Sequence, residues 1–157
     1  MALILVFLLA SAGGFQESEV SLFNVPTPIE KCMEPISAQY HVSGRINPFY
    51  LRGDFDGDGR LDHAVLVTGQ SDDRSIVVCR AASRAPEIIA DKSLPVNMAG
   101  RAFDAWMVFP KAPVGRGVET GPPPKLLGDA LLIMWSESAS GLLYWNGQKF
   151  RWYHQGD

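Results

Sequence analysis

A run of nine residues, from Asp54 to Asp62, restricts the fold of this chain more than any other segment. The run reads DFDGDGRLD, so carboxylates stand at its first, third, fifth and ninth positions and glycines at its fourth and sixth. Alternate acidic residues around a glycine bend can point their oxygens at one centre, and Ca²⁺ takes about 6–8 oxygen ligands at about 2.3–2.6 Å. Without a cation, four carboxylates this close repel one another. We therefore expect a calcium loop, and the alternative is a solvated acidic turn that holds no ion.

The flanks of the loop separate the families that use such acidic runs. An EF-hand has helices on both sides and a bidentate Glu at position twelve. Here position twelve is Val65, and residues 61–68 are rich in β-branched side chains, which favour strands. A dockerin repeats its loop, whereas this chain contains the loop once. With a strand expected on each side, residues 49–67 instead resemble the FG-GAP (VCBS-type) repeat, whose calcium loop joins two strands.

The resemblance implies a set of metal ligands and limits the architecture. It covers about an eighth of the chain. In integrins and bacterial surface proteins such repeats build seven-bladed propellers, and 157 residues cannot supply seven blades of roughly 40–50 residues each. We therefore expect a stand-alone or two-unit relative. The implied ligands are the carboxylates of four aspartates and one backbone carbonyl: Asp54, Asp56, Asp58, Asp62 and the carbonyl of Arg60.

The N-terminus has the pattern of an export signal. Residues 1–12 are apolar and close on Ala10-x-Ala12, the small-residue pattern of a signal-peptidase site. The alternative is a buried N-terminal helix or strand, and the run is too short for a membrane span, which needs about 20 apolar residues. We expect a signal peptide at 1–12, a leader at 13–26 and one calcium-loop-containing, β-rich domain at 27–157. The mature chain would be periplasmic or secreted and would have no membrane span.

Two cysteines, Cys32 and Cys79, allow one disulfide bridge in an exported chain. Both lie on apolar faces of their predicted elements. That placement fits a bridge and fits two buried thiols equally well, so the sequence leaves the two alternatives open.

One helix and several short strands are expected. Thr27, as N-cap, with Pro28 and Glu30 after it, predicts a helix start. A stripe at helical spacing follows, which we expect to pack on a sheet: Ile29, Cys32, Met33, Ile36 and Tyr40. The predicted strands are 49–52, 63–68, 75–80, 103–109, 130–135, 142–145 and 150–154. Asn146-Gly147 predicts a two-residue hairpin between the last two.

A weak internal similarity relates two parts of the chain. Residues 62–67 followed by 75–78 resemble residues 129–134 followed by 141–144, each reading as strand, polar turn and strand. In the second copy, residues 121–125, Gly-Pro-Pro-Pro-Lys, take the place of the acidic loop. The similarity indicates either an old duplication in which one copy kept the ion or two ordinary hairpins.

Charge and motifs argue against several classes of function. The net charge is −3 and no run of Lys or Arg occurs, so we expect no nucleic-acid partner. No HExxH or Gly-x-Ser-x-Gly pattern is present, and Ser136 to Gly141 reads as a polar turn. We therefore predict no catalytic residue and no enzyme. The C-terminal half is rich in aromatic residues, which serve either as core or as partner anchors: Trp106, Trp135, Trp145 and Trp152.

These observations predict an α+β fold. We expect about six to eight mostly antiparallel strands, with one N-terminal helix packed on the sheet. The expected function is an exported, non-catalytic, monomeric domain that uses Ca²⁺ structurally and contacts an unidentified protein or cell-surface partner. The alternative is a periplasmic inhibitor or immunity-type protein that acts on a cell-wall enzyme or toxin through residues 136–141 or the Gly/Pro-rich stretch 114–125.

Overall fold

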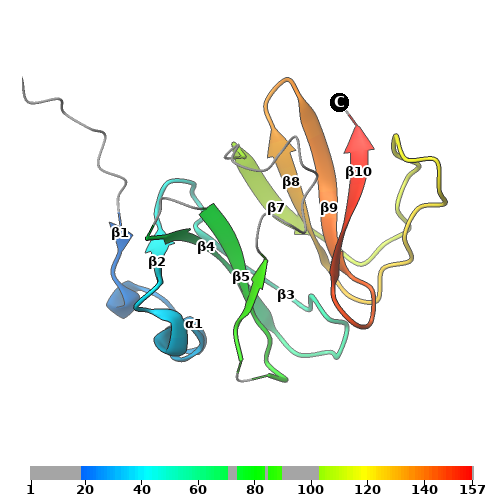
Figure 1. Ribbon diagram of the computed structural model, residues 1–157. Helices are drawn as coiled ribbons and strands as arrows, with labels where there is room; N and C mark the ends of the chain where they lie inside the picture. Colours follow the sequence, from blue (N-terminus) through cyan, green and yellow to red (C-terminus); the bar gives the residue numbers. More distant parts are fainter. Residues whose placement is uncertain (1–18, 71–73, 84, 90–102, 157) are drawn as a thin grey trace, which may run out of the picture.

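The computed structural model describes residues 19–70, 74–83, 85–89 and 103–156. The predicted signal peptide, residues 1–12, lies outside these ranges. The described chain is mostly antiparallel β-structure in two sheets, with one short α-helix beside the first sheet (Figure 1). The predicted β-rich class is confirmed. The sheets hold six and four strands, more than expected, because β1 and β6 are too short to show a sequence pattern and the start of β2 was assigned to the helical stripe.

The first sheet has the strand order β1-β2-β4-β5-β6, and β3 also pairs with β4. β2 and β3 share one edge of β4, since β3 pairs with residues 62–65 and β2 with residues 67–69. Two residues from the predicted leader form β1. The strands are β1 Glu19–Val20, β2 Tyr40–Ser43, β3 Tyr50–Gly53, β4 Asp62–Gly69, β5 Arg74–Cys79 and β6 Glu87–Ile89.

The second sheet is an antiparallel meander in the order β10-β9-β8-β7. The hairpin between β9 and β10 was predicted, but its turn lies one residue later than expected. The amide of Asn146 donates to the carbonyl of Lys149 at 3.1 Å, so Gly147 and Gln148 occupy the centre, and Gly147 has a φ of 99°. The strands are β7 Ala105–Phe109, β8 Ala130–Trp135, β9 Ala139–Trp145 and β10 Phe150–Gly156.

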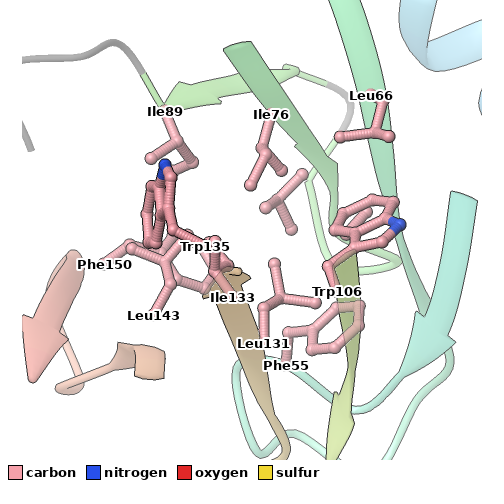
Figure 2. Packing of buried hydrophobic residues seen from close by; sticks show 12 residues of the cluster. Phe55, Leu66, Ile76, Ile89, Trp106, Leu131, Ile133, Trp135, Leu143 and Phe150 are labelled. Atoms are coloured by element: carbon pink, nitrogen blue, oxygen red, sulfur yellow. The ribbon is translucent and has the colours of Figure 1, made fainter. Parts of the chain in front are cut away.

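The main core lies between the two sheets (Figure 2). Trp106 and Trp135 are buried in it, and Trp145 and Trp152 are partly buried against it. The aromatic residues therefore serve the core in the first place. The buried members are Phe55, Ala64, Leu66, Ile76, Val78, Ile89, Trp106, Leu131, Ile133, Trp135, Leu143 and Phe150.

The helix α1 comprises Thr27–Met33 and contacts β4 and β5 of the first sheet. Its buried residues Ile29 and Met33 belong to a second cluster together with valines of β2, β4 and β5. Cys32 and Cys79 form a disulfide with their Cα atoms 5.8 Å apart. The structure thus decides between bridge and thiols in favour of the bridge. A cross-link over 47 residues stabilises the fold by about 4 kcal/mol in the chain-entropy model.

The helix is shorter than its apolar stripe predicted, and it starts differently. It ends at Met33, and a 3-10 turn, Glu34–Ile36, follows it. Pro35 cannot donate a helical hydrogen bond, which explains the early end. Tyr40 belongs to β2 and not to the helical stripe. No side chain caps the N-terminus, since the cap position is Pro26 and Thr27 is already helical.

The internal similarity has a structural counterpart. β3 to β6 and β7 to β10 are two four-stranded meanders in the same order. Asp62 stands at the start of β4, and Asp129 directly precedes β8. The amide two residues after β3, on Phe55, donates to Asp62 at 3.0 Å, and the amide two residues after β7, on Lys111, donates to Asp129 at 2.9 Å. The shared hydrogen bond favours duplication over coincidence.

The two meanders pack through the same face. Ala64 and Leu66 correspond to Leu131 and Ile133, and all four lie in the core between the sheets. Val78, opposite Ala64, and Leu143, opposite Leu131, lie there too, so strand pairing shifts the second strands by one residue from the sequence alignment. When two units contact each other through the same face, the interface is isologous and leaves no such face free for a third unit. A ring of repeats instead needs contacts between two different faces of neighbouring units. The two units therefore form a closed sandwich and not a fragment of a propeller.

Gly141 tests the packing inside the second sheet. A Cβ at Gly141 in β9 would overlap the indole of Trp152, which lies on the neighbouring strand β10, two residues from the partner of Gly141. We expect Gly141→Ala to lower the free energy of unfolding by about 1–3 kcal/mol, because the ring must move. Gly115→Ala is the matched control, since a Cβ there meets nothing within 4 Å. Urea denaturation of both variants measures the difference, and equal midpoints would contradict this packing.

Candidate metal site

The acidic loop joins two strands, as predicted, and lies where four connections meet. It runs from the end of β3 to the start of β4. Contacts of Gly57 and Gly147 with Leu127 and a hydrogen bond between Ala81 and Asp62 bring the connections together. We name this region the loop end. It comprises residues 54–61, 80–83, 110–129 and 146–149.

Three of the predicted ligands are close enough for one ion. Asp54, Asp56 and Asp58 each offer a carboxylate oxygen, and these oxygens all lie within 4.8 Å of one another. Two oxygens that bind one Ca²⁺ at about 2.3–2.6 Å can be at most about 5 Å apart. The spacing and the hard oxygen donors therefore fit calcium. Asp54 and Asp56 are half-buried and Asp58 is exposed.

Asp54 holds the bend of the loop. Its Oδ1 accepts the amide of Gly57 at 2.8 Å, and its Oδ2 accepts the amide of Gly59 at 3.0 Å. Gly57 and Gly59 have φ values of 80° and 83°, a region that residues with a Cβ avoid. The bend thus requires glycine at the fourth and sixth positions.

The other two carboxylates of the group face arginines. Asp58 Oδ2 lies 2.7 Å from Nη2 and 2.9 Å from Nε of Arg60. Hydrogen bonds from the amide and then from the side chain of Arg60 lower the pKa of Asp58 below its ordinary value. Asp56 Oδ2 lies 3.5 Å from Nη1 of Arg80. Positive charge therefore already balances part of the acidic group.

Asp62 has a different position from the other three aspartates. It is fully buried, and its oxygens accept the amide of Phe55 at 3.0 Å and that of Ala81 at 2.7 Å. Burial raises the pKa of Asp62, against the lowering effect of the Ala81 amide. Asp62 is not part of the group formed by the other three aspartates. Arg60 contacts Asp58 through its amide and its guanidinium. The ligand roles of Asp62 and of the Arg60 carbonyl stay predictions.

Phe55 anchors the loop in the core. Its side chain is fully buried between the sheets, near Leu131 in the close-up view (Figure 2). The loop thus alternates carboxylates directed to one centre with an aromatic ring directed into the protein. This alternation is visible in the sequence, where Phe55 stands between Asp54 and Asp56.

Asp129 ties the loop to the second sheet, a role that its sequence context did not predict. Its Oδ2 accepts the amide of Asp54 at 3.1 Å, and its own amide donates to the carbonyl of Asp54 at 2.7 Å. A Cβ on Gly57 would lie 2.5 Å from the carbonyl oxygen of Leu127, so the backbones are in close contact. The internal similarity, which aligns Asp129 with Asp62, was the signal in the sequence that could have indicated this role.

Arg80 makes a second connection between the sheets. Its Nε lies 3.4 Å from Glu87 Oε2, and its guanidinium carbon lies 4.6 Å from the centre of the Trp145 ring in β9. Burial raises the pKa of Glu87. Together with the contact to Asp56, these interactions place one cation between the acidic loop, β6 and the second sheet.

Comparison with family models, with curated proteins and with solved structures finds no match for this chain. Within the described ranges, no helix is long and apolar enough to cross a membrane.

Asp129 offers a test of the tie between loop and sheet. We expect Asp129→Ala to lower the free energy of unfolding by about 1–3 kcal/mol, because the half-buried amide of Asp54 loses its acceptor. Asp104→Ala is the control. Asp104 accepts one exposed amide, that of Ser136, and its removal should cost less than about 1 kcal/mol. Chemical denaturation compares the two, and a larger loss for Asp104→Ala would contradict the assignment.

Proposed function

We propose that this chain is an exported, non-catalytic calcium-binding domain whose ion stiffens the loop end for contact with another macromolecule. One observation carries the proposal. Asp54, Asp56 and Asp58 hold oxygens at a spacing that one Ca²⁺ spans, on a loop fixed to both sheets. The order of these residues is also that of the FG-GAP loop, which supports calcium over other cations.

Further ligands would complete the coordination. Three carboxylates fall short of the 6–8 oxygens that calcium takes unless some bind through both oxygens or water contributes. The Arg60 carbonyl and Asp62 are the remaining members of the proposed set. Each oxygen of an ionised carboxylate has two acceptor sites, so the amides on Asp62 leave capacity for a metal.

The ion would act as a structural tie and not as a sensor. Extracellular calcium modules bind at about 10⁻⁴–10⁻³ M. With a dissociation constant of about 10⁻⁴ M and about 1 mM Ca²⁺, binding stabilises the folded chain by about 1.4 kcal/mol. Occupancy is then nearly constant, and the ion mainly removes repulsion among the carboxylates.

Exposed apolar side chains at the loop end support a role in macromolecular contact. Leu61, within the acidic loop, is 47% exposed, and Leu127, in the connection that packs on it, is 40% exposed. A fixed loop that carries exposed leucines loses little conformational entropy on binding. The partner in this proposal is a protein or cell-surface component.

The inhibitor alternative is favoured by a separate feature. Residues 136–138 form an exposed turn, in which Glu137 has a φ of 55°. A non-glycine residue held in this region presents its side chain in a preset geometry, at a cost of about 1–3 kcal/mol. Capture of one periplasmic enzyme or toxin by the wild type, and its loss in Glu137→Gly, would favour this alternative.

Calorimetric titration tests the calcium proposal directly. We expect one Ca²⁺ per chain, bound in the range of about 10⁻⁴–10⁻³ M. Asp56→Asn/Asp58→Asn should remove the binding, because two of the three clustered carboxylates lose their charge. Asp104→Asn, which alters a carboxylate in another turn, should bind as the wild type does. No heat of binding for the wild type would contradict the proposal.

Arg60 provides a second test, with the opposite sign. Its guanidinium competes with a cation for Asp58 Oδ2. We expect Arg60→Gln to strengthen calcium binding by about two- to five-fold, the effect of an exposed ion pair. Arg151→Gln on β10 makes the same change in net charge away from the loop and should leave the affinity unchanged. Weaker binding by Arg60→Gln would contradict the competition.

A further inference from the structure

Three consecutive residues, Cys79 to Ala81, connect the helix α1 to the acidic loop. Cys79 ends β5 and is bonded to Cys32 in α1. Arg80 lies 3.5 Å from a carboxylate oxygen of Asp56. The amide of Ala81 donates to Asp62 Oδ1 at 2.7 Å. We name residues 79–81 the connecting segment.

The bridge holds this segment at the place where the sheet would open first. The pair His63 and Cys79 is the last one between β4 and β5 at the loop end. The ends of strands open at a lower free energy than their centres. On the other side of the bridge, Ile29 and Met33 fix α1 on the sheet, and both are fully buried. The disulfide therefore ties an end that frays easily to a helix that does not.

The contacts of the connecting segment are those that order the loop. Asp62 accepts amides from both Phe55 and Ala81, so it joins the loop to the segment. Arg80 provides the cation next to Asp56. If residues 79–81 move away, the loop loses the ion pair of Asp56 and a part-buried hydrogen bond to Asp62, while its tie to Asp129 stays in place.

We infer that formation of the Cys32–Cys79 bridge controls the order of the acidic loop, so that an ordered loop requires an oxidised chain. A chain kept reduced before export would then hold the loop loosely, and oxidation after export would complete the site. The link to calcium rests on the proposed function. The link between the bridge and loop order needs no ion.

The redox step requires a thiol partner. In reduction, a small dithiol gives two electrons and two protons, the Sγ–Sγ bond breaks to two thiols, and the dithiol leaves as its own disulfide. Oxidation by a disulfide compound runs the same exchange in reverse. Cys32 and Cys79 are only 9% and 6% exposed, so we expect the exchange in the folded chain to be slow.

Hydrogen exchange with the protein in chelator tests the inference without metal. Exchange rates are measured for the wild type and for Cys32→Ser/Cys79→Ser. In each protein, the rates of residues 54–62 are compared with those of β8, residues 130–135 of the second sheet. We expect exchange in the loop to be at least about ten-fold faster in the variant, with little change in β8, since local opening affects only the segment that frays. Equal rates in the loop, or the same acceleration in both regions, would overturn the inference.

Two further measurements keep the test decisive. If the double variant does not fold, the oxidised protein still carries the test. Arg80→Gln in the oxidised protein removes one contact of the segment and should give a smaller acceleration in the loop. Calcium titration separates the two proposals. An oxidised wild type that binds no Ca²⁺ refutes the proposed function alone, and equal affinity in oxidised and reduced protein refutes the control of the site by the bridge.

Discussion

Two hydrogen bonds between Asp54 and Asp129 join the first residue of the acidic loop to the residue that directly precedes β8 of the second sheet. One runs from the Asp54 amide to the Asp129 carboxylate, and the other from the Asp129 amide to the Asp54 carbonyl. Gly57 also lies directly against the backbone of Leu127, so the first half of the loop packs on the second sheet. The carboxylates of the loop are therefore fixed by the whole sandwich and not by a local turn alone.

The repeated plan of the two meanders explains why this contact exists. In each copy a carboxylate at the start of the second strand accepts an amide that follows the first strand, from Phe55 in one copy and from Lys111 in the other. In the second copy that carboxylate, Asp129, also accepts the amide of Asp54. Like faces meet in the core, so the repeats close into a sandwich. A chain with one acidic loop can then be stable without the ring that longer repeat proteins build.

Local patterns made the loop, the hairpin at Asn146 and most longer strands predictable, because their spacing and turn residues lie within a few positions of one another. Strands β1 and β6 have two and three residues, too few for an alternating pattern, and Tyr40 at the start of β2 also fitted the helical stripe. The choice between bridge and thiols depended on the packing of α1 against β5, which spacing does not reveal. Similarly, the burial of Asp62 and the position of Arg80 beside Trp145 depend on contacts between the sheets.

In the proposed function, a cation bound by the loop strengthens the sandwich as a whole. Thermal unfolding of the oxidised protein in about 1 mM Ca²⁺ and in chelator measures this effect. We expect a midpoint about 5 °C higher with calcium, from about 1.4 kcal/mol of binding free energy. We expect no difference when Asp56 and Asp58 are both changed to Asn. Equal midpoints for the wild type in calcium and in chelator would show that no such stabilising ion binds.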